Sequence, residues 1–547
     1  MLESASPVTT KNGTEVPPRL AGHVVVEALI EYGVDTVFAV PGESYLAVLD
    51  GLHEHRDSIH QVTARQEGGA AMMAAAYGRA SGTPGVCMVT RGPGATNASI
   101  GVHVAAQDAS PMILLIGQVP ERNRQRVAFQ EIDYSAFFGS IAKAVIEIAS
   151  PDRAAEQMSR ALSLSVSGEP GPVIVVLPED TLTRTTTVPA VRSAPAARPT
   201  PSTSDIDRTV ELLGEAKRPV IIAGRCNWSP EASTRLQEIA EGSQIPVITA
   251  VRCQDVIDNR STAYVGTLGL NTSPGLPALV EQADLVVFLG TRPDALTMGD
   301  FSLLTPPRPA ATVVHVYPDS NVFGRVYAAD LGIAVSPEEF LAALPGQITA
   351  PNGRSDWLQT LRDNDAARST GAPADELSAD YMRIFDELMP AETVTTAGAG
   401  NYTAWQQRHR RFVHYPSQLA SQSGSMGYGI PAGVTAAHLY RDRSVVTFSG
   451  DGCFMMTGQE LATAAAEELD LLVILVNNSR FGTIRDHQDR EFPDRVSGTD
   501  LHNPDFTQLA RSYGAETARV DTPEDFRSAL EQLRDRSGLR LIEVVVP

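Results

Sequence analysis

The feature that most constrains the fold is a repeated alternation between short apolar segments and segments with helical periodicity. The apolar segments include GVCMVT, PMILLIG, PVIVVLP, PVIIAG, PVITA, LVVFLG, TVVHV, SVVTFSG and LLVILVNN. They are continuous runs rich in Val and Ile, which is typical of strands that are buried on both faces of a parallel sheet. The sequence therefore predicts an α/β fold made of doubly wound, mostly parallel sheets.

Two stretches interrupt this alternation. One is rich in Pro, Ala and Ser and indicates a semi-extended linker, and the other is a partly helical connector. A chain of 547 residues is also too long for one core, because single cores stop growing at about 250–300 residues. We expect three α/β domains, of which the first and third share a similar plan. The expected segments are a disordered lead-in at 1–18, a first domain at 19–186, a linker at 187–204, a central domain at 205–345, a connector at 346–375 and a third domain at 376–547.

Composition excludes several partners and environments. The net charge of −21 argues against nucleic acid or an anionic membrane surface as the main partner. No apolar run approaches the roughly 20 residues that span a bilayer, and the first residues do not resemble a signal peptide. The cysteines Cys87, Cys226, Cys253 and Cys453 are scattered, which argues against a disulfide framework or a Cys-based metal site. A reducing cytoplasm fits this pattern.

The strongest chemical signal is the segment SVVTFSGDGCFMMTGQELATAAAEELDLLVILVNN. It predicts a strand ending at Gly450, a helix at about 456–468 and a second strand ending near Asn478. In a right-handed βαβ unit, Asp451 and Asn478 emerge together at the carboxyl ends of parallel strands, where open α/β sheets bind ligands. One carboxylate and one amide oxygen suit Mg²⁺, and small residues around Asp451 let backbone N–H groups approach a diphosphate. Turn formation is the alternative, because Asp-Gly and Asn-Asn are common turn formers.

This pattern resembles the signature of thiamin-diphosphate enzymes, most closely the acetolactate synthase branch, and the resemblance covers the whole chain. It implies a pyrimidine-binding domain first, a central domain second and a diphosphate-binding domain third. Asp451 and Asn478 would be side-chain ligands to Mg²⁺, and Arg480 would offer its backbone carbonyl. The implied cofactor-binding positions of the third domain are Gly398, Gly400, Asn401, Gly424, Met426, Gly450, Asp451, Gly452, Cys453 and Asn478.

Two of these implied roles concern the shape and the activation of the cofactor. In SGSMGYGIP, Met426 would support the bent cofactor and the Gly424 carbonyl would accept a hydrogen bond from its aminopyrimidine; alternatively, Met426 only fills a gap. In RQEGGAAMMAAAYGRASG, Glu67 would hydrogen-bond the pyrimidine and activate the cofactor. An isolated Glu at that place would otherwise cap the helix. Because the family assembles each site between two subunits, we expect a homodimer as the minimum active unit and a homotetramer as the larger assembly.

The segment RVAFQEIDYSAFF favours the acetolactate synthase branch, because Phe129 and Gln130 match its active-site pair near the bound substrate. Simple 2-oxo acid decarboxylases resemble the chain less well. Their pyruvate decarboxylase type carries a His-His pair where this chain has GQVPERN, and the benzoylformate type has a His where this chain has Thr90.

Several positions depart from the acetolactate synthase pattern. Glu169, Arg225 and Cys226 replace residues that support a structural flavin, and only Arg292 and Asp294 remain of a further flavin-contacting segment. A negative charge near a diphosphate and bulk in its loop both oppose binding. We therefore expect no tightly bound FAD.

Three further departures bear on the substrate pocket. His487 stands where the family places a Trp that helps select the acceptor, although a surface His is the ordinary interpretation. Glu179 replaces the family's Lys. Glu43, in FAVPGESYL, occupies the turn that closes over the thiazolium, where pyruvate decarboxylase-like enzymes also carry an acid. Glu43 can relay a proton there if burial raises its pKa, or Glu43 or Ser44 can cap the next helix.

The sequence thus supports an enzyme that decarboxylates a pyruvate-like 2-oxo acid and joins the acyl group to an aldehyde or a second 2-oxo acid. The alternative is a non-oxidative decarboxylase or a C–C hydrolase with the same cofactor. A non-catalytic thiamin-binding protein is disfavoured, because Glu67, Asp451 and Asn478 are all present.

Overall fold

The computed structural model describes residues 8–9, 15–189, 191, 197–367 and 373–547. Within these residues the strands form three six-stranded parallel sheets and two short two-stranded ladders. Every apolar segment quoted above is a strand of one of the three sheets, and most of these strands are fully buried. The predicted α/β class with parallel sheets is confirmed.

The chain folds into two compact units, each built from segments that are separated in the sequence. The first contains residues 1–197, 430–439 and 457–469, and the second contains 198–429, 440–456 and 470–547. Two segments that follow the central domain in sequence therefore belong to the same unit as the first sheet.

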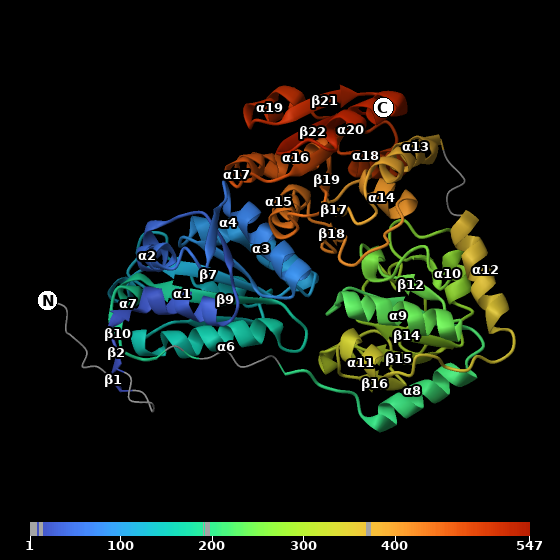
Figure 1. Cartoon of the computed structure of the whole chain (residues 1–547), viewed down its shortest axis with the longest axis horizontal. Coiled ribbons are helices and arrows are strands. Elements are labelled where there is room, and N and C mark those ends of the chain that lie inside the picture. Colours follow the sequence, from blue (N-terminus) through green and yellow to red (C-terminus); the bar gives the residue numbers. More distant parts are fainter. Residues whose placement is uncertain (1–7, 10–14, 190, 192–196, 368–372) are drawn as a thin grey trace. The chain divides into compact units, whose positions relative to one another are not determined.

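The first sheet has the strand order β5-β4-β6-β7-β9-β8. Helices α1, α2 and α6 pack on one face, where a cluster of Val, Ile, Leu and Ala forms the core, and α3 and α4 cover the other face (Figure 1). The bounds are β3 Arg19–Leu20, α1 Ala21–Glu31, β4 Thr36–Ala39, η1 Glu43–Tyr45, α2 Leu46–Glu54, β5 His60–Thr63, α3 Glu67–Ser81, β6 Gly85–Val89, α4 Pro93–Gln107, β7 Met112–Gln118, η2 Glu121–Asn123, α5 Tyr134–Phe138, β8 Ala144–Glu147, η3 Pro151–Arg153, α6 Ala154–Val166, β9 Pro172–Pro178, α7 Glu179–Leu182 and β10 Thr185–Thr186.

The third sheet has the strand order β18-β17-β19-β20-β22-β21. Numbered from its own first strand, this order is the same as that of the first sheet, which confirms the predicted similarity of plan. The bounds are α13 Pro373–Leu388, β17 Val394–Ala397, α14 Thr403–His409, β18 Gln418–Ala420, α15 Gly429–Leu439, β19 Val445–Gly450, α16 Asp451–Thr457, η6 Gly458–Glu460, α17 Leu461–Ala466, β20 Leu471–Asn477, α18 Gly482–Glu491, α19 Phe506–Ser512, β21 Glu516–Val520, α20 Pro523–Leu533 and β22 Leu539–Val545.

The central sheet has a different order, β13-β12-β11-β14-β15-β16, which is the order of the dinucleotide-binding doubly wound fold. Apolar clusters cover both of its faces. The bounds are α8 Thr203–Glu215, β11 Pro219–Ala223, α9 Pro230–Ser243, β12 Val247–Thr249, η4 Gln254–Val256, β13 Tyr264–Thr267, α10 Leu276–Val280, β14 Leu285–Leu289, β15 Thr312–Val316, η5 Ser320–Val322, β16 Leu331–Ile333, α11 Pro337–Ala343 and α12 Arg354–Ala367.

Each sheet has a topological switch point, where successive connections leave toward opposite edges. The switch points lie between β4 and β6, between β11 and β14, and between β17 and β19. Doubly wound sheets bind ligands at the carboxyl ends of the strands at these positions. The fold therefore directs attention to the loops that follow these six strands.

The helix after the Gly-Asp-Gly turn differs from the sequence prediction. It begins at Asp451 itself, is interrupted by a 3₁₀ turn at 458–460 and ends at Ala466. A carboxylate in the first turn is favourable, because the N-terminus of a helix carries partial positive charge. Asp451 therefore lies at a helix N-terminus and not in a preceding loop.

The connecting segments are described only in part. In the predicted lead-in, Val8–Thr9 and Glu15–Val16 pair as a short antiparallel ladder, and residues 1–7 and 10–14 lie outside the described residues. In the linker and the connector, residues 190, 192–196 and 368–372 also lie outside them. The domain boundaries and the disorder of the lead-in remain predictions. Among the described residues, no helix combines the length and the apolarity needed to cross a membrane.

Candidate active site

The turn that carries Glu43 lies against the end of the neighbouring strand β6. The Ser44 and Thr90 hydroxyl oxygens are 3.0 Å apart. Glycine is required at two places for this approach, because a Cβ at Gly42 would lie 2.6 Å from Thr90 Cβ and one at Gly117 would lie 2.1 Å from Ser44 Oγ. The loops after β4 and β6 therefore meet at the switch point of the first sheet.

Glu43 is held by an ion pair and not by a helix cap. Its Oε1 accepts a hydrogen bond from Arg91 Nη2 at 2.7 Å, and its side chain is 71% exposed. Arg91 is 8% exposed, and its Nη1 lies 3.9 Å from Glu179 Oε2. The cap positions of η1 and α2 are Gly42 and Tyr45, and within the described chain neither helix has a side-chain cap. The capping alternative for Glu43 or Ser44 is therefore wrong.

Glu67 is the first residue of α3. The residue that caps this helix is Gln66, whose side chain accepts a hydrogen bond from the Gly69 amide at 3.0 Å. The Glu67 carboxylate instead accepts a hydrogen bond from Asn97 Nδ2 at 2.9 Å. A Cβ at Gly94 would lie 3.4 Å from Glu67 Oε1, so glycine at this position leaves the carboxylate accessible on that side. Glu67 is thus oriented by α4 and is not needed as a cap.

The charge of Glu67 also helps to raise the pKa of two buried groups of the first domain, Cys87 and Tyr45. Burial raises the pKa of the Cys87 thiol far above its usual value, and the Glu67 charge adds to this effect. Burial likewise raises the pKa of Tyr45, with the Cys87 and Glu67 charges as further causes. Both groups therefore remain protonated at neutral pH.

A second acid, Glu460, anchors the turn that precedes Glu67. Its side chain is fully buried, and it accepts hydrogen bonds from the backbone amides of Arg65 at 3.1 Å and Gln66 at 3.0 Å and from Thr463 Oγ1 at 2.7 Å. Burial raises its pKa. The sequence analysis missed Glu460, because nothing in its local pattern indicates a contact with residues almost 400 positions earlier.

Phe129 and Gln130 lie in a strained segment beside the turn that follows β6, at Arg91 and Gly92. Gln125, Val127 and Gln130 have φ of 60°, 56° and 64°, in the left-handed region that residues other than glycine rarely adopt. A Cβ at Gly92 would lie 2.6 Å from the Gln130 carbonyl oxygen. Phe129 is 71% exposed, and its carbonyl accepts a 3.4 Å contact from Arg91 Nε. Strain of this kind persists only where the surroundings fix the backbone.

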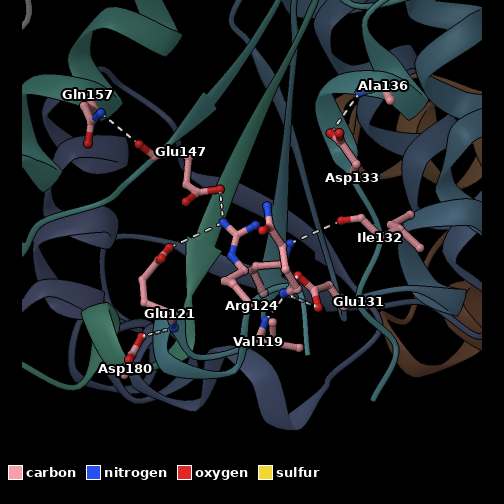
Figure 2. Close-up of polar contacts among 12 residues, drawn as sticks. Val119, Glu121, Arg124, Glu131, Ile132, Asp133, Ala136, Glu147, Gln157 and Asp180 are labelled. Carbon is pink, nitrogen blue, oxygen red and sulfur yellow. Dashed lines mark hydrogen bonds and ion pairs between the residues drawn. The ribbon is translucent and has the colours of Figure 1, made fainter. Parts of the chain in front are cut away.

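Figure 2 shows how the surroundings fix this segment. Arg124 points between Glu121 and Glu147 and forms ion pairs with both. The Glu121 amide donates to Asp180 at 3.1 Å, and the Glu131 carboxylate accepts from the Gln125 amide at 3.1 Å. The segment borders a cavity of about 610 Å³. These anchors lie on both sides of Phe129 and Gln130 and leave the Phe129 side chain exposed.

In the third sheet, Cys453 joins three loops that carry predicted cofactor-binding residues. Its Sγ accepts hydrogen bonds from Tyr402 Oη at 3.2 Å and from the Gly427 amide at 3.1 Å. The Gly398 amide donates to Tyr402 Oη at 3.0 Å, and a Cβ at Gly398 would lie 2.5 Å from Cys453 Sγ. The loops after β17 and β19 and the segment before α15 therefore converge at the switch point of this sheet.

The predicted metal ligands Asp451 and Asn478 directly follow the neighbouring strands β19 and β20. Asp451 is 3% exposed; its Oδ1 accepts from the Gly452 amide at 2.9 Å and its Oδ2 from Asn503 Nδ2 at 2.8 Å. Asn478 Oδ1 accepts from the Arg480 amide at 3.3 Å. Asn503 was missed by the sequence analysis, because it comes from a loop 52 residues after Asp451.

Asn401 reaches the loop of Asn478. A Cβ at Gly482 would lie 3.0 Å from Asn478 Nδ2 and 3.4 Å from Asn401 Nδ2. Asn401 also donates to Asp486 Oδ2 at 2.6 Å and accepts from Thr483 Oγ1 at 2.7 Å. The side-chain oxygen atoms of Asn401, Asn478 and Asp451 are of the kind that coordinates a hard cation. Among the described residues there is no cluster of three His, Cys, Asp or Glu side chains that would indicate a different metal site.

Two predicted residues have simpler surroundings. His487 is on α18 with its side chain 54% exposed, and its Nδ1 lies 2.5 Å from Arg490 Nη2. Met426 is partly buried and packs against the core of the third sheet, whereas Gly424 is exposed with φ of 65°. The contacts of His487 and Met426 are those of a surface histidine and a packing methionine, and their roles at the cofactor remain predictions.

At the central switch point, Arg225 follows β11 and is 4% exposed. It donates to the carbonyl oxygens of Ala420 at 2.9 Å and Arg252 at 2.6 Å. A Cβ at the neighbouring Gly224 would lie 2.2 Å from Thr291 Cβ. This loop is filled by protein side chains, and Arg225 contacts the last residue of β18.

Comparisons with known proteins agree with this geometry. Family models for thiamine pyrophosphate enzymes match in three parts: the N-terminal TPP binding domain at 19–137, the central domain at 206–344 and the C-terminal TPP binding domain at 398–544. The chain is 30% identical to the acetolactate synthase large subunit of Corynebacterium glutamicum over 96% of this chain and 87% of that one. It is 29% identical to the isozyme 2 large subunit of Escherichia coli over 95% and 94%, and 32% identical to an acetolactate synthase of Mycobacterium bovis over 93% and 85%. The chain therefore belongs to the thiamine pyrophosphate (thiamin diphosphate) enzymes and is an acetolactate synthase-like member of that family.

Proposed function

We propose that this enzyme decarboxylates a pyruvate-like 2-oxo acid and joins the acyl group to the carbonyl carbon of an aldehyde or a second 2-oxo acid. The observation that carries the proposal is the placement of Glu67. Glu67 is the first residue of α3, a helix that is mostly buried. Asn97 orients its carboxylate, which lies beside the switch point of the first sheet. An oriented carboxylate that is free of a capping role is suited to hydrogen-bond the pyrimidine of the cofactor.

The residues of the third sheet fit thiamin diphosphate and Mg²⁺. Asp451, Asn478 and the carbonyl of Arg480 supply hard oxygen donors, and the N-terminus of α16 favours the negative charge of a diphosphate. Gly398, Gly450 and Gly452 are positions where a side chain would collide with Cys453, Tyr402 or Phe481. When bound, thiamin diphosphate supplies the nucleophilic carbon that adds to the 2-oxo acid and stabilises the charge left after CO₂ departs.

The chain's own residues then bind substrate and move protons. Glu67 holds and exchanges the proton at the pyrimidine ring. Phe129 offers an apolar surface to the substrate, and Gln130 offers an amide for its oxygen atoms. Glu43 and His487 lie near the substrate in this proposal, and Arg91 fixes the position of the Glu43 carboxylate.

Product analysis tests this function. Purified enzyme with thiamin diphosphate and Mg²⁺ is incubated with ¹³C-labelled pyruvate, with and without an added aldehyde, and the products are identified by NMR. We expect a new C–C bonded hydroxyketone or 2-hydroxy-3-oxo acid. Release of free acetaldehyde as the sole product would contradict carboligation and support the alternative, a non-oxidative decarboxylase.

FAD does not fit the central domain in our interpretation. The loop after β11 holds the buried Arg225 side chain at the position where the family resemblance places a flavin-binding glycine. We expect enzyme purified from cells to lack flavin absorbance near about 450 nm. A stoichiometric flavin spectrum would overturn this expectation.

We further propose that the enzyme acts in the cytoplasm as a homodimer or homotetramer in which Glu67 serves cofactor held by the partner subunit. Mixing the variants Glu67→Gln and Asp451→Asn, at Mg²⁺ and cofactor concentrations too low to restore Asp451→Asn alone, tests the shared site. Dissociation and reassociation would restore about a quarter of the wild-type activity, because half of the dimers are mixed and one site in each mixed dimer is intact. If the site lies within one chain, no activity returns.

A further inference from the structure

Two positions at which the sequence departs from the acetolactate synthase pattern, Glu43 and Glu179, are held by the same guanidinium. Arg91 Nη2 lies 2.7 Å from Glu43 Oε1, and Arg91 Nη1 lies 3.9 Å from Glu179 Oε2. Among the described residues, Nη1 has no hydrogen-bond partner. We call Arg91, Glu43 and Glu179 the Arg91 cluster. One cation faces two carboxylates, so the cluster carries one negative charge in excess.

The charges of the cluster are exposed unequally. The Arg91 side chain is 9% exposed, whereas the Glu43 and Glu179 side chains are 71% and 44% exposed. The positive charge is therefore beneath the surface, and the surface presents carboxylates. An approaching anion meets these carboxylates before it meets the guanidinium.

The cluster belongs to the turn that carries the rest of the first-sheet site. Thr90, next to Arg91, contacts Ser44 on one side and lies 3.0 Å from a Cβ placed at Gly94 on the other, and that Cβ would lie 3.4 Å from Glu67. Arg91 Nε also contacts the Phe129 carbonyl at 3.4 Å. The Arg91 cluster is thus fixed between Glu67 and the Phe129 segment.

We propose that the Arg91 cluster selects the acceptor of the reaction and favours neutral carbonyl compounds, aldehydes and uncharged ketones, over a second 2-oxo acid. This inference rests on the proposed function, because that function places Glu67 at the cofactor and Phe129 at the substrate. The donor 2-oxo acid loses its carboxylate as CO₂, but a 2-oxo acid acceptor keeps its negative charge in the product. Like charge at the surface of the site therefore acts against the acceptor throughout the C–C bond-forming step.

The reaction balances with an aldehyde acceptor. A 2-oxo acid anion, an aldehyde and one proton give a 2-hydroxyketone and CO₂. The C–COO⁻ bond of the donor breaks, and its electron pair forms the new bond to the aldehyde carbon. The aldehyde oxygen takes the proton, so no oxidant or reductant is required.

A competition between matched acceptors tests the proposal. Wild-type enzyme receives saturating ¹³C-labelled pyruvate with equal amounts of 2-oxobutanoate and its methyl ester, which differ by one charge, and the two cross-products are quantified. Propanal serves as a smaller neutral acceptor. We expect wild-type enzyme to prefer the ester and propanal, and Glu43→Gln and Glu179→Gln each to raise the share of 2-oxobutanoate product about three- to tenfold, less at high salt.

Arg91→Gln gives a readout of opposite sign, because it removes the positive charge and leaves both carboxylates. We expect it to lower the 2-oxobutanoate share further, in protein whose thermal midpoint shows that it is folded. Glu156→Gln is the matched control, since Glu156 forms an exposed pair with Arg153 at 2.8 Å on α6 and should leave the ratio unchanged.

The possible failures are distinguishable. A wild-type preference for 2-oxobutanoate that the Glu43 and Glu179 variants leave unchanged would overturn the acceptor proposal while preserving carboligation. Acetaldehyde without any C–C bonded product from any acceptor would overturn the proposed function itself.

Discussion

The first and third sheets have the same strand order, yet their switch points carry different chemistry. The first presents charged side chains, Glu43, Arg91 and Glu67, each fixed by a side-chain partner. The third presents glycines, amides and one buried carboxylate, Asp451, fixed largely through backbone amides and Asn503. The same topology therefore places different side chains at the positions where doubly wound sheets bind ligands.

Under the proposed function, the first sheet exchanges the proton and the third sheet retains the cofactor. The central sheet has the dinucleotide-binding strand order, but at its switch point the buried Arg225 side chain donates to the Ala420 carbonyl at the end of β18. A switch point is therefore a permitted binding position and not an obligatory one.

The largest expected effect separates the two chemical roles. Glu67→Gln should lower turnover by about two to four orders of magnitude, because the amide cannot exchange a proton with the pyrimidine. Thiamin diphosphate binding, measured by calorimetry, should remain close to wild type. Unchanged turnover would show that the activating acid lies elsewhere.

Asp451→Asn should have the converse effect. Loss of a charged oxygen donor should weaken Mg²⁺-dependent cofactor binding about 10- to 100-fold, and excess Mg²⁺ and cofactor should recover part of the activity. Titration of activity against Mg²⁺ measures the shift. If the variant binds cofactor normally but has lost turnover, the division of roles between the sheets is wrong.

The anchor of the first-sheet site gives the next effect. Glu460→Ala leaves the partly buried backbone amides of Arg65 and Gln66 and the buried Thr463 hydroxyl without their acceptor and should lower the free energy of unfolding by about 2–4 kcal/mol. It should also reduce kcat, because the turn before Glu67 loses its support. Glu460→Gln keeps an acceptor oxygen and should recover most of both losses. Equal loss in both variants would mean that the charge of Glu460 and not its hydrogen bonds is required.

The smallest expected effect is on the pH dependence of stability and comes from His315 in the central sheet. His315 is 2% exposed, its Nε2 lies 3.0 Å from the Thr291 carbonyl oxygen, and burial lowers its pKa to about 4. Because the folded-state pKa is below the unfolded value near 6.5, the stabilisation by neutral His315 is complete above about pH 6.5 and is lost as pH falls toward 4. At pH 5 this loss should be about 1–2 kcal/mol. His315→Gln should flatten the decline of the thermal midpoint between pH 7 and 5, and a decline equal to wild type would contradict this assignment.

Much of the fold could be predicted because buried parallel strands are continuous apolar runs, as in PMILLIG and LLVILVNN. Edge strands such as β5, HQVT, and β21, ETARV, were harder to predict because they are partly exposed and mixed in composition. Asp451 and Asn478 were predictable from position, since both follow buried strands. Arg91, Asn97, Glu460 and Asn503 were not, because their functions depend on contacts between loops that the local sequence does not encode.

The central claim is that Glu67 activates a cofactor that the third-sheet residues hold. Exchange of the thiazolium C2 proton for deuterium, followed by quenched-flow NMR on bound thiamin diphosphate, tests it directly. The account predicts fast exchange in wild-type enzyme and a rate at least about 100-fold lower in Glu67→Gln with cofactor still bound. Exchange at the wild-type rate in that variant would contradict it.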